Sequence, residues 1–184
     1  MSGVVKNVLE ESLGKRELHE RLGQQRKNMG LLRRAAFSFH TLQEARDLAL
    51  LLADISMSPE RTVSGYSELL VNAVEHGNLG ITYAEKSRLL AEDKWAQEVE
   101  DRLRSPQYAD KLVEVILDKA GDMLKVTITD QGQGFDWNKY LQFDPERMFD
   151  LHGRGIAMSR GISFDQLEYL GKGNSVVTTV KLKN

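Results

Sequence analysis

The sequence contains no cysteine, so disulfide bonds, thiolate nucleophiles and zinc–thiolate sites are excluded. Its four histidines are scattered, and no two of them have the spacing of metal ligands. No apolar run approaches the roughly 18 residues of a membrane-spanning helix, and the N-terminus lacks the apolar core of a signal peptide. The net charge of −2 provides no basic surface for nucleic acid. We therefore expect a soluble, cytoplasmic protein with no direct nucleic-acid partner and no membrane partner.

The length of 184 residues favours one domain, and 41% hydrophobic residues suffice for a single core. Residues 1–34 are charged and only weakly periodic, which predicts a helical arm or a linker from a larger signalling protein; disorder at its start is an open alternative. Residues 35–184 form the predicted domain, which carries a polar insertion at 81–111.

Hydrophobic periodicity predicts a first strand, two long helices and two strand pairs in this domain. The expected elements are a strand at 36–40, helices at 42–55 and from Pro59 to near Gly77, strands at 112–117 and 124–130, a short helix at 155–160, and strands at 164–170 and 176–182. Thr41 is the expected N-cap of the first long helix, and Pro59 stands at the first position of the second. Turns at 119–122 and 171–174 close the two strand pairs.

The insertion at 81–111 contains 13 charged residues and a sparse apolar stripe. The stripe consists of Leu89, Ala96, Val99 and Leu103. This pattern predicts one amphipathic helix that stops near Pro106. We expect it to contact another protein and to lie outside any ligand site, with packing onto its own domain as the alternative.

Three polar residues, Glu68, Asn72 and His76, stand at positions i, i+4 and i+8 of the second long helix. Helical spacing places them on one face, while the apolar residues between them fall on the opposite face. A carboxylate and an amide one turn apart are a plausible way to hold a hydrated metal ion and a water molecule. Taken singly, each would be an ordinary polar residue of a helix surface.

Two glycine-rich motifs follow along the chain: Asp130-x-Gly132-x-Gly134 and Gly153-Arg154-Gly155. Alternate glycines after a strand let the backbone turn tightly against a flat ligand. Asp130 can accept a hydrogen bond from an exocyclic amine such as adenine N6, although an ordinary Asx turn is the alternative. The second motif opens a helix, whose free amides suit phosphate. Neither motif has the G-x-G-x-x-G spacing of dinucleotide-binding folds.

In this order, the motifs resemble those of the Bergerat-fold ATP-binding family, which includes histidine kinases, gyrase-type and Hsp90-type ATPases and anti-sigma-factor serine kinases. The Asn box matches Glu68-x-x-x-Asn72-Ala-x-x-His76, and the first glycine box matches Asp130-x-Gly132-x-Gly134. The second glycine box matches Gly153-Arg154-Gly155-Ile156-Ala157, and the turn at 171–175 resembles the family's closing glycine turn. The resemblance covers residues 36–183.

The resemblance implies an α/β two-layer sandwich with a mixed, mainly antiparallel sheet and helices on one face, and it implies ATP and Mg²⁺ as ligands. Glu68 would be the general base, and Asn72 would bind the metal. The implied ATP-binding residues are Asn72, His76, Asp130, Gly132, Gly134, Gly153, Arg154, Gly155 and Ile156. Residues 135–152 would form a lid over the nucleotide.

Within the family, the chain looks most like the anti-sigma-factor serine/threonine kinases. Histidine kinases commonly carry a basic residue three positions after the Asn, where this chain has Glu75, and His19 is its only candidate phosphoacceptor histidine. The resemblance thus implies transfer of the ATP γ-phosphate to a Ser or Thr of a small antagonist protein. It also allows a sigma factor as a partner, and a homodimer. The alternatives are an ATP-binding regulatory module without catalysis and the detached catalytic domain of a sensor histidine kinase.

Overall fold

The computed structural model describes residues 31–137 and 162–182. The predicted arm at 1–34 therefore lies almost wholly outside the described residues, as does the predicted helix at 155–160. All the described helices and strands belong to one compact unit that begins at Arg33. Within the described part of the chain, no helix is both long enough and apolar enough to cross a membrane.

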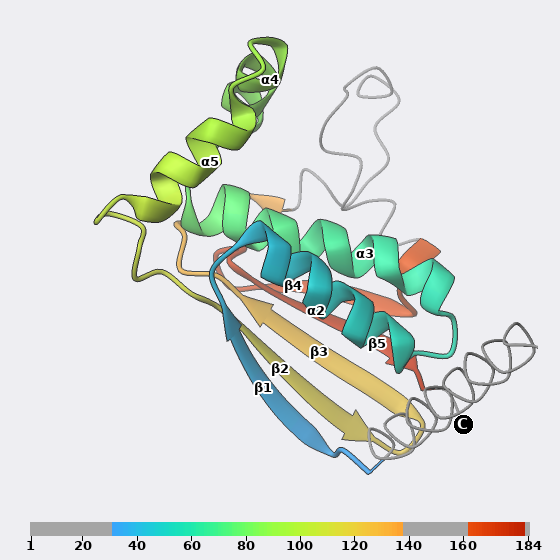
Figure 1. The fold of residues 1–184 in the computed structure, drawn as a ribbon. Helices are drawn as coiled ribbons and strands as arrows, with labels where there is room; N and C mark the ends of the chain where they lie inside the picture. The colour runs from blue at the N-terminus through green and yellow to red at the C-terminus, as the bar shows by residue number, and fades with distance from the viewer. Residues whose placement is uncertain (1–30, 138–161, 183–184) are drawn as a thin grey trace, which may run out of the picture. The chain divides into compact units, whose positions relative to one another are not determined.

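Ten elements follow one another in the described chain (Figure 1). They are β1 (Arg34–Phe39), α2 (Leu42–Asp54), α3 (Pro59–Asn72), the π-helix η1 (Ala73–Asn78), α4 (Tyr83–Ala91), α5 (Trp95–Arg104), β2 (Val113–Ala120), β3 (Met123–Thr129), β4 (Gln166–Leu170) and β5 (Ser175–Lys181). The strands and the two long helices predicted from the sequence are thus confirmed. The observed ends of the strands differ from the predicted ends by no more than three residues.

The strands form one sheet in the order β1-β2-β3-β5-β4. Every pairing between these described strands is antiparallel, so the sheet is more regular than the mixed sheet expected from the sequence. Helices α2 and α3 lie across one face of the sheet, as Figure 1 shows. The two-layer α/β fold predicted from the sequence is therefore confirmed.

The core lies between these two layers and consists of one face of the sheet and the inner faces of α2 and α3. Alternate strand residues are buried, as a sheet with one covered face requires. The buried residues include Leu48, Leu52, Tyr66, Leu70, Val113, Val115, Leu124, Val126 and Val180. Thr41 caps α2 in a reciprocal capping box with Glu44, as its position before the apolar stripe predicts.

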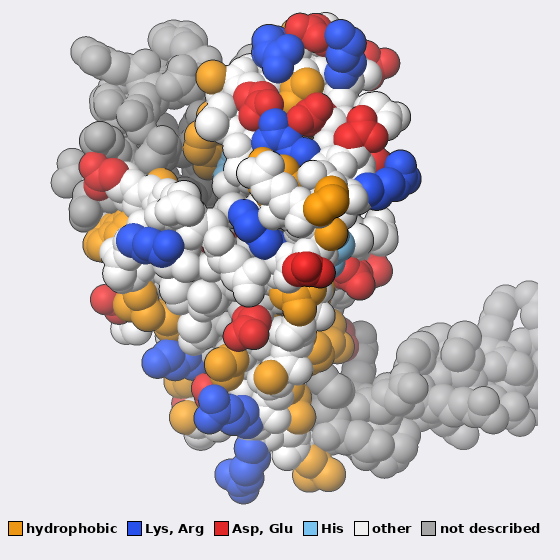
Figure 2. Space-filling view, turned by 90° about the vertical axis from the view of Figure 1, so that its left-hand side faces the viewer, with side chains coloured by type: hydrophobic (Ala, Val, Ile, Leu, Met, Phe, Trp, Pro, Cys, Tyr) orange, Lys and Arg blue, Asp and Glu red, His pale blue; other side chains and the backbone are white. Residues whose placement is uncertain are grey.

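The insertion at 81–111 forms two helices, so the prediction of one continuous helix was wrong. Asp93 has φ 55°, a left-handed conformation that breaks the helix between α4 and α5 and that Asp tolerates better than most residues. Leu89 of α4 and Val99 of α5 are both buried. The break lets the insertion bury an apolar residue from each half. Figure 2 shows acidic and basic side chains intermixed at the upper end of the molecule, where α4 and α5 lie in Figure 1.

Candidate functional site

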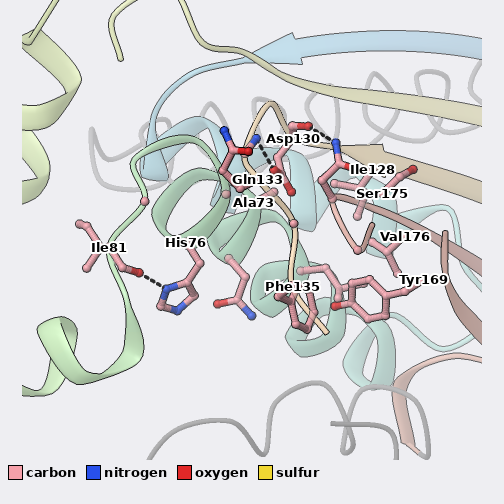
Figure 3. A pocket seen from close by; sticks show the side chains of 18 of the residues that line it. Ala73, His76, Ile81, Ile128, Asp130, Gln133, Phe135, Tyr169, Ser175 and Val176 are labelled. Atoms are coloured by element: carbon pink, nitrogen blue, oxygen red, sulfur yellow. Dashed lines mark hydrogen bonds between the residues drawn. The ribbon is translucent and has the colours of Figure 1, made fainter. Parts of the chain in front are cut away.

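A cavity of about 520 Å³ opens beside the C-terminal end of α3 (Figure 3). Its walls come from α3 and η1, from the loop after β3, from the start of β5 and from the insertion. The lining residues include Leu69, Asn72, Ala73, His76, Gly77, Thr82, Tyr83, Gln107, Lys111, Ile128, Asp130, Gly132, Gly134, Phe135, Tyr169, Asn174 and Val176. The cavity therefore brings together the Asn-box helix and the first glycine motif, which lie some 60 residues apart in the sequence.

Asn72 lines the cavity, and its side-chain nitrogen donates a hydrogen bond of 2.9 Å to Glu68 Oε1. This i, i+4 bond is the one expected when both residues share a helix face. The bond directs the amide nitrogen toward Glu68, and the amide oxygen is the atom of the Asn72 side chain that can bind a cation. Glu68 lies one helical turn before Asn72. It is half-buried and does not itself line the cavity.

The helix changes its winding immediately after Asn72. Residues Ala73–Asn78 form a π-helix, and a π-helical turn inside a helix is a frequent feature of functional sites. His76 still reaches the cavity beside Asn72, so the prediction that these two residues serve the same site agrees with the geometry. Glu75, in contrast, is fully buried and does not line the cavity.

His76 contributes a flat, uncharged surface to the cavity. Its Nδ1 is hydrogen-bonded to the carbonyl of Ile81, so Nδ1 carries the hydrogen and donates it. Burial lowers the pKa of His76, which keeps the ring neutral at pH 7. Nε2 is buried and has no partner among the residues that the structure describes. A neutral imidazole suits contact with a ring or a hydrogen-bond donor better than contact with a phosphate.

Asp130 follows β3 and also lines the cavity. Its Oδ1 accepts a hydrogen bond of 2.7 Å from the backbone N–H of Gly132, which is the Asx turn that the sequence left open. Asn174 fixes the backbone of Asp130 through two further bonds, of 3.0 and 2.8 Å. Burial raises the pKa of Asp130 to about 6, although the Gly132 N–H and the charge of Lys172 act in the opposite direction. The turn and a role in ligand binding are therefore compatible.

The glycine motif is packed tightly against η1 and the closing turn. A Cβ at Gly77 would lie 2.4 Å from Asp130 Cγ, and a Cβ at Gly132 would lie 2.4 Å from the carbonyl oxygen of Gly77. Gly134 has φ 76°, and a Cβ there would lie 2.1 Å from the carbonyl oxygen of Lys172. These glycines are required because backbone and side-chain atoms approach where a Cβ would stand.

Aromatic rings form the opposite side of the cavity. Phe135 packs edge-on against Tyr169, with ring centroids 5.2 Å apart, and the Trp137 ring is stacked with Tyr169 at a centroid distance of 6.4 Å. In Figure 3, His76 and Ile81 stand to the left, and Phe135 and Tyr169 stand to the right. The cavity thus offers flat walls, a carboxylate at one edge and an amide oxygen, an arrangement suited to a planar base with polar appendages.

Sequence reasoning missed the contribution of the insertion to this cavity. Thr82 and Tyr83 at its start, and Gln107 and Lys111 at its end, line the cavity. The two ends of the insertion therefore lie at the candidate site, whereas we expected the whole segment to stand apart from it. The stripe of apolar residues within the insertion indicated its packing, but no motif indicated that both of its ends return to the cavity.

Four predicted ligand residues, Gly153, Arg154, Gly155 and Ile156, lie outside the described residues, and their roles stay predictions. The same holds for most of the predicted lid at 135–152, whose described part is 135–137. Among residues 31–137 and 162–182, no group of three or more His, Asp or Glu side chains could hold a metal ion. Any metal ion at this cavity would thus need oxygen atoms from a bound molecule in addition to the amide oxygen of Asn72.

Comparison with known protein families agrees with this geometry. A family model described as "Histidine kinase-like ATPase domain" matches residues 38–181. The match contains the Asn-box helix, both glycine motifs and the whole described sheet except the first residues of β1 and the bridge at Leu182. No protein of curated function matches the sequence. ATP binding is expected of a domain of this kind. The match spans most of the chain, which therefore belongs to the family of histidine kinase-like ATPase domains.

Proposed function

We propose that this protein is an ATP-dependent serine/threonine kinase of the partner-switching type, which transfers the γ-phosphate of ATP to a small antagonist protein in the cytoplasm. The observation that carries the proposal is the hydrogen bond between Glu68 and Asn72 at the edge of the cavity. It joins a carboxylate able to accept a proton to an amide oxygen able to bind a cation.

Asn72 fits a role as the protein ligand of Mg²⁺, because its amide nitrogen is turned toward Glu68 and its amide oxygen is the kind of ligand that Mg²⁺ prefers. Mg²⁺ would neutralise charge on the ATP phosphates when bound. The serine or threonine hydroxyl oxygen of the antagonist would form a bond to the γ-phosphorus, while Glu68 would accept the hydroxyl proton. The bond from the γ-phosphorus to the β–γ bridging oxygen would break, and ADP would leave.

Asp130 would recognise the adenine. Its carboxylate lies at the end of β3, and it can accept a hydrogen bond from the exocyclic amine of adenine. Guanine presents a carbonyl at the corresponding position, so an acceptor there disfavours GTP. This assignment gives a reason for the position of Asp130, whose half-buried carboxyl lines the cavity although burial raises its pKa.

The environment of Glu75 favours a serine kinase over the catalytic domain of a histidine kinase. Histidine kinases commonly have a basic residue at this position. Here Glu75 is buried and accepts hydrogen bonds from Lys86 and Trp95 of the insertion, both of 2.6 Å. In this chain the residue at that position therefore attaches the insertion to the domain. The partners that we propose are the antagonist protein and a sigma factor.

A phosphotransfer assay tests the proposal. The purified chain is incubated with Mg²⁺ and γ-labelled ATP, alone and with candidate antagonist proteins that carry an accessible serine. Acid-stable label on an antagonist, lost with Glu68→Gln, would support the proposal. Acid-labile label on a histidine would support a histidine kinase domain. ATP binding without transfer to any candidate would support a regulatory module.

A further inference from the structure

We propose that the insertion forms part of the base-binding end of the cavity, with Tyr83 as a contact of the nucleotide base and Glu75 as the residue that positions it. The inference rests on nucleotide binding as set out under the proposed function. It assigns a ligand-binding role to a segment that the sequence motifs leave unassigned. Three observations carry it: the place of Tyr83, the anchoring of α4 and α5, and the burial of Glu75.

Tyr83 lies against His76 in the cavity wall. The two ring centroids are 4.2 Å apart, with a tilt of 46° between the rings, and both residues line the cavity. Tyr83 is the first residue of α4, and the side chain of Thr82 caps that helix by accepting a hydrogen bond of 3.2 Å from Glu85 N. The ring is therefore held by a capped helix and not by a free loop. A base that contacts His76 would meet an aromatic surface made by both residues.

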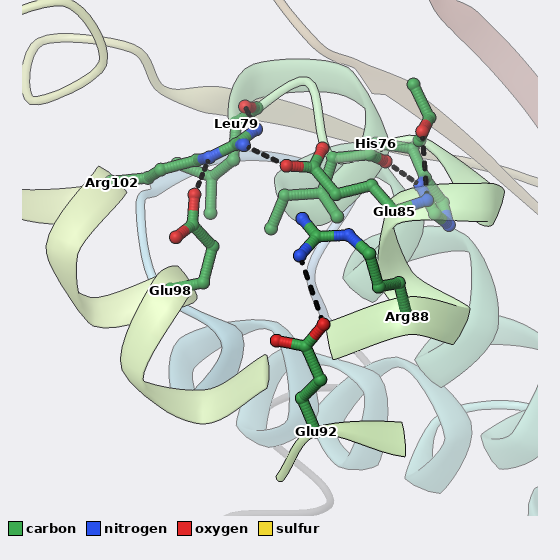
Figure 4. Close-up of polar contacts among 9 residues, drawn as sticks. His76, Leu79, Glu85, Arg88, Glu92, Glu98 and Arg102 are labelled. Atoms are coloured by element: carbon green, nitrogen blue, oxygen red, sulfur yellow. Dashed lines mark hydrogen bonds and ion pairs between the residues drawn. The ribbon is translucent and has the colours of Figure 1, made fainter. Parts of the chain in front are cut away.

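Arg102 of α5 fastens the insertion together and to the domain, as Figure 4 shows. Its guanidinium donates to the carbonyl of Leu79 at 2.9 Å, to Glu85 at 2.5 Å and to Glu98 at 2.7 Å. Its side chain is only 18% exposed. One arginine thus connects α5, α4 and the chain that leaves η1, so the two helices keep a fixed position beside the cavity.

Glu75 gives the insertion its position relative to His76, its neighbour in the chain. The carboxylate is completely buried, and it accepts one hydrogen bond from Lys86 of α4 and one from Trp95 of α5. A buried charge without partners is strongly unfavourable, so Glu75 favours the arrangement in which both helices stay against η1. A partner that moved α4 or α5 would have to break this network, and Tyr83 would move with α4.

The far end of the insertion returns to the same cavity. Lys111 Nζ donates a hydrogen bond of 3.0 Å to the carbonyl of Asn78, the last residue of η1, and also lies 5.0 Å from the ring centroid of Tyr108. Lys111 and Gln107 both line the cavity. Because both ends of the insertion line the cavity and its middle is bonded to Glu75, the geometry is that of a wall and differs from that of an arm extended toward a partner.

The test compares Tyr83→Ala with Tyr83→Phe by calorimetry, using Mg·ATP and Mg·CTP as probes. Stacking of one base on an aromatic ring is worth about 1–3 kcal/mol, so Tyr83→Ala should weaken ATP binding about tenfold. It should also reduce the preference for ATP over CTP, because a purine offers more area for stacking. Tyr83→Phe keeps the ring and should bind within about twofold of the native chain. Leu90→Ala, a substitution on the exposed side of α4, is the matched control.

The role of Glu75 is tested through Lys86, which is absent from the cavity lining. Lys86→Met should also reduce the ATP-over-CTP preference, and Lys86→Arg should restore it, whereas a purely structural role would leave that preference unchanged. Native affinity and preference in Tyr83→Ala, with native circular dichroism, would overturn the inference. A native chain that binds ATP but transfers no phosphate would contradict only the proposed kinase activity, and one that binds no ATP would overturn both.

Discussion

The side-chain nitrogen of Asn72 donates a hydrogen bond of 2.9 Å to Glu68 Oε1 at the edge of the cavity. The bond orients the Asn72 amide, because it turns the amide nitrogen toward Glu68 and so places the amide oxygen on the other branch of the group. It also gives the two residues separate roles, since one supplies an oxygen ligand and the other a carboxylate. Substitutions at these positions should therefore have different effects on binding and on transfer.

Asn72→Ala should weaken Mg·ATP binding by more than tenfold, about 1.4 kcal/mol or more, because the proposed cation loses its protein ligand. Calorimetry in the presence and absence of Mg²⁺ measures the effect. Gln43→Ala is a matched control, because Gln43 makes the same kind of i, i+4 amide–carboxylate bond, with Asp47, on the exposed side of α2. Unchanged affinity in Asn72→Ala, with a native circular dichroism spectrum, would remove Asn72 from the site.

Glu68→Gln should reduce phosphotransfer by about 10²–10⁴-fold, the usual contribution of a general base. Nucleotide affinity should stay within a few-fold of the native value, because the substituted amide oxygen can still accept the hydrogen bond from Asn72. Single-turnover transfer to an antagonist and calorimetry with Mg·ATP separate the two quantities. Transfer at the native rate would show that Glu68 is not the base.

Much of the fold follows from local sequence signals that act over a few residues. The capping box of Thr41 and Glu44, the proline at the start of α3 and the alternation in β2 and β3 each specify their element without help from distant residues. The Asn box and the first glycine motif could be placed in one site because their spacing resembles a known family. The expectation that the ligand is ATP comes from this resemblance and not from periodicity.

The role of the insertion could not be predicted, because it depends on contacts between residues far apart in sequence. No local pattern indicates that Glu75 is buried, because its partners Lys86 and Trp95 stand 11 and 20 positions later. The break at Asp93 was equally hidden, because nothing in a polar segment marks a single residue with positive φ. Only the fold shows that 81–111 must pack against η1 to satisfy a buried carboxylate.

ATP affinity should fall as the pH is lowered from 7.5 to 5.5, because protonation of Asp130 removes the acceptor for the adenine amine. Burial raises the pKa of this group to about 6 from its ordinary value of 3.8. Asp130→Asn should bind ATP more weakly at pH 7.5 and discriminate less against GTP. The phosphates of ATP titrate equally in both proteins, so the difference between their pH profiles reports Asp130. Parallel profiles would contradict the assignment.

The same raised pKa fixes the sign of the effect on stability. Between about pH 3.8 and 6 the folded protein holds the Asp130 proton more tightly than the unfolded chain does. The contribution of Asp130 to the free energy of unfolding is therefore greatest below pH 3.8 and decreases as the pH rises through this window. Urea unfolding of the native chain and of Asp130→Asn, compared at several pH values, isolates this contribution. Ligand affinity and stability should thus respond to Asp130 ionisation in opposite directions.

Gly77→Ala should lower both stability and ATP affinity, because the added Cβ would lie 2.4 Å from Asp130 Cγ and would displace the first glycine motif. Overpacking of this kind typically costs about 1–3 kcal/mol. Gly121→Ala is the control: it has φ 61° and open space around it, so it should lose about 1–2 kcal/mol of stability through backbone strain and no ATP affinity. Equal ATP affinity in the two variants would show that the contact of Gly77 with Asp130 does not shape the site.

Lys86→Met should lower the free energy of unfolding by about 2–4 kcal/mol, since it leaves Glu75 as a buried carboxylate bonded only to Trp95. Lys94→Met is the matched control, because Lys94 pairs with Glu92 at 2.9 Å but is 67% exposed, and surface pairs contribute about 0–1 kcal/mol.

Adding Glu75→Leu to Lys86→Met should recover part of the loss, because it removes the unpaired charge and replaces it with an apolar side chain. The three variants and the native chain are compared by urea unfolding. Replacement of residues 83–109 by a short Gly/Ser linker removes both partners of Glu75 and should therefore be more destabilising than Lys86→Met alone. If Lys86→Met costs no more than Lys94→Met, the buried pair does not hold the insertion on η1.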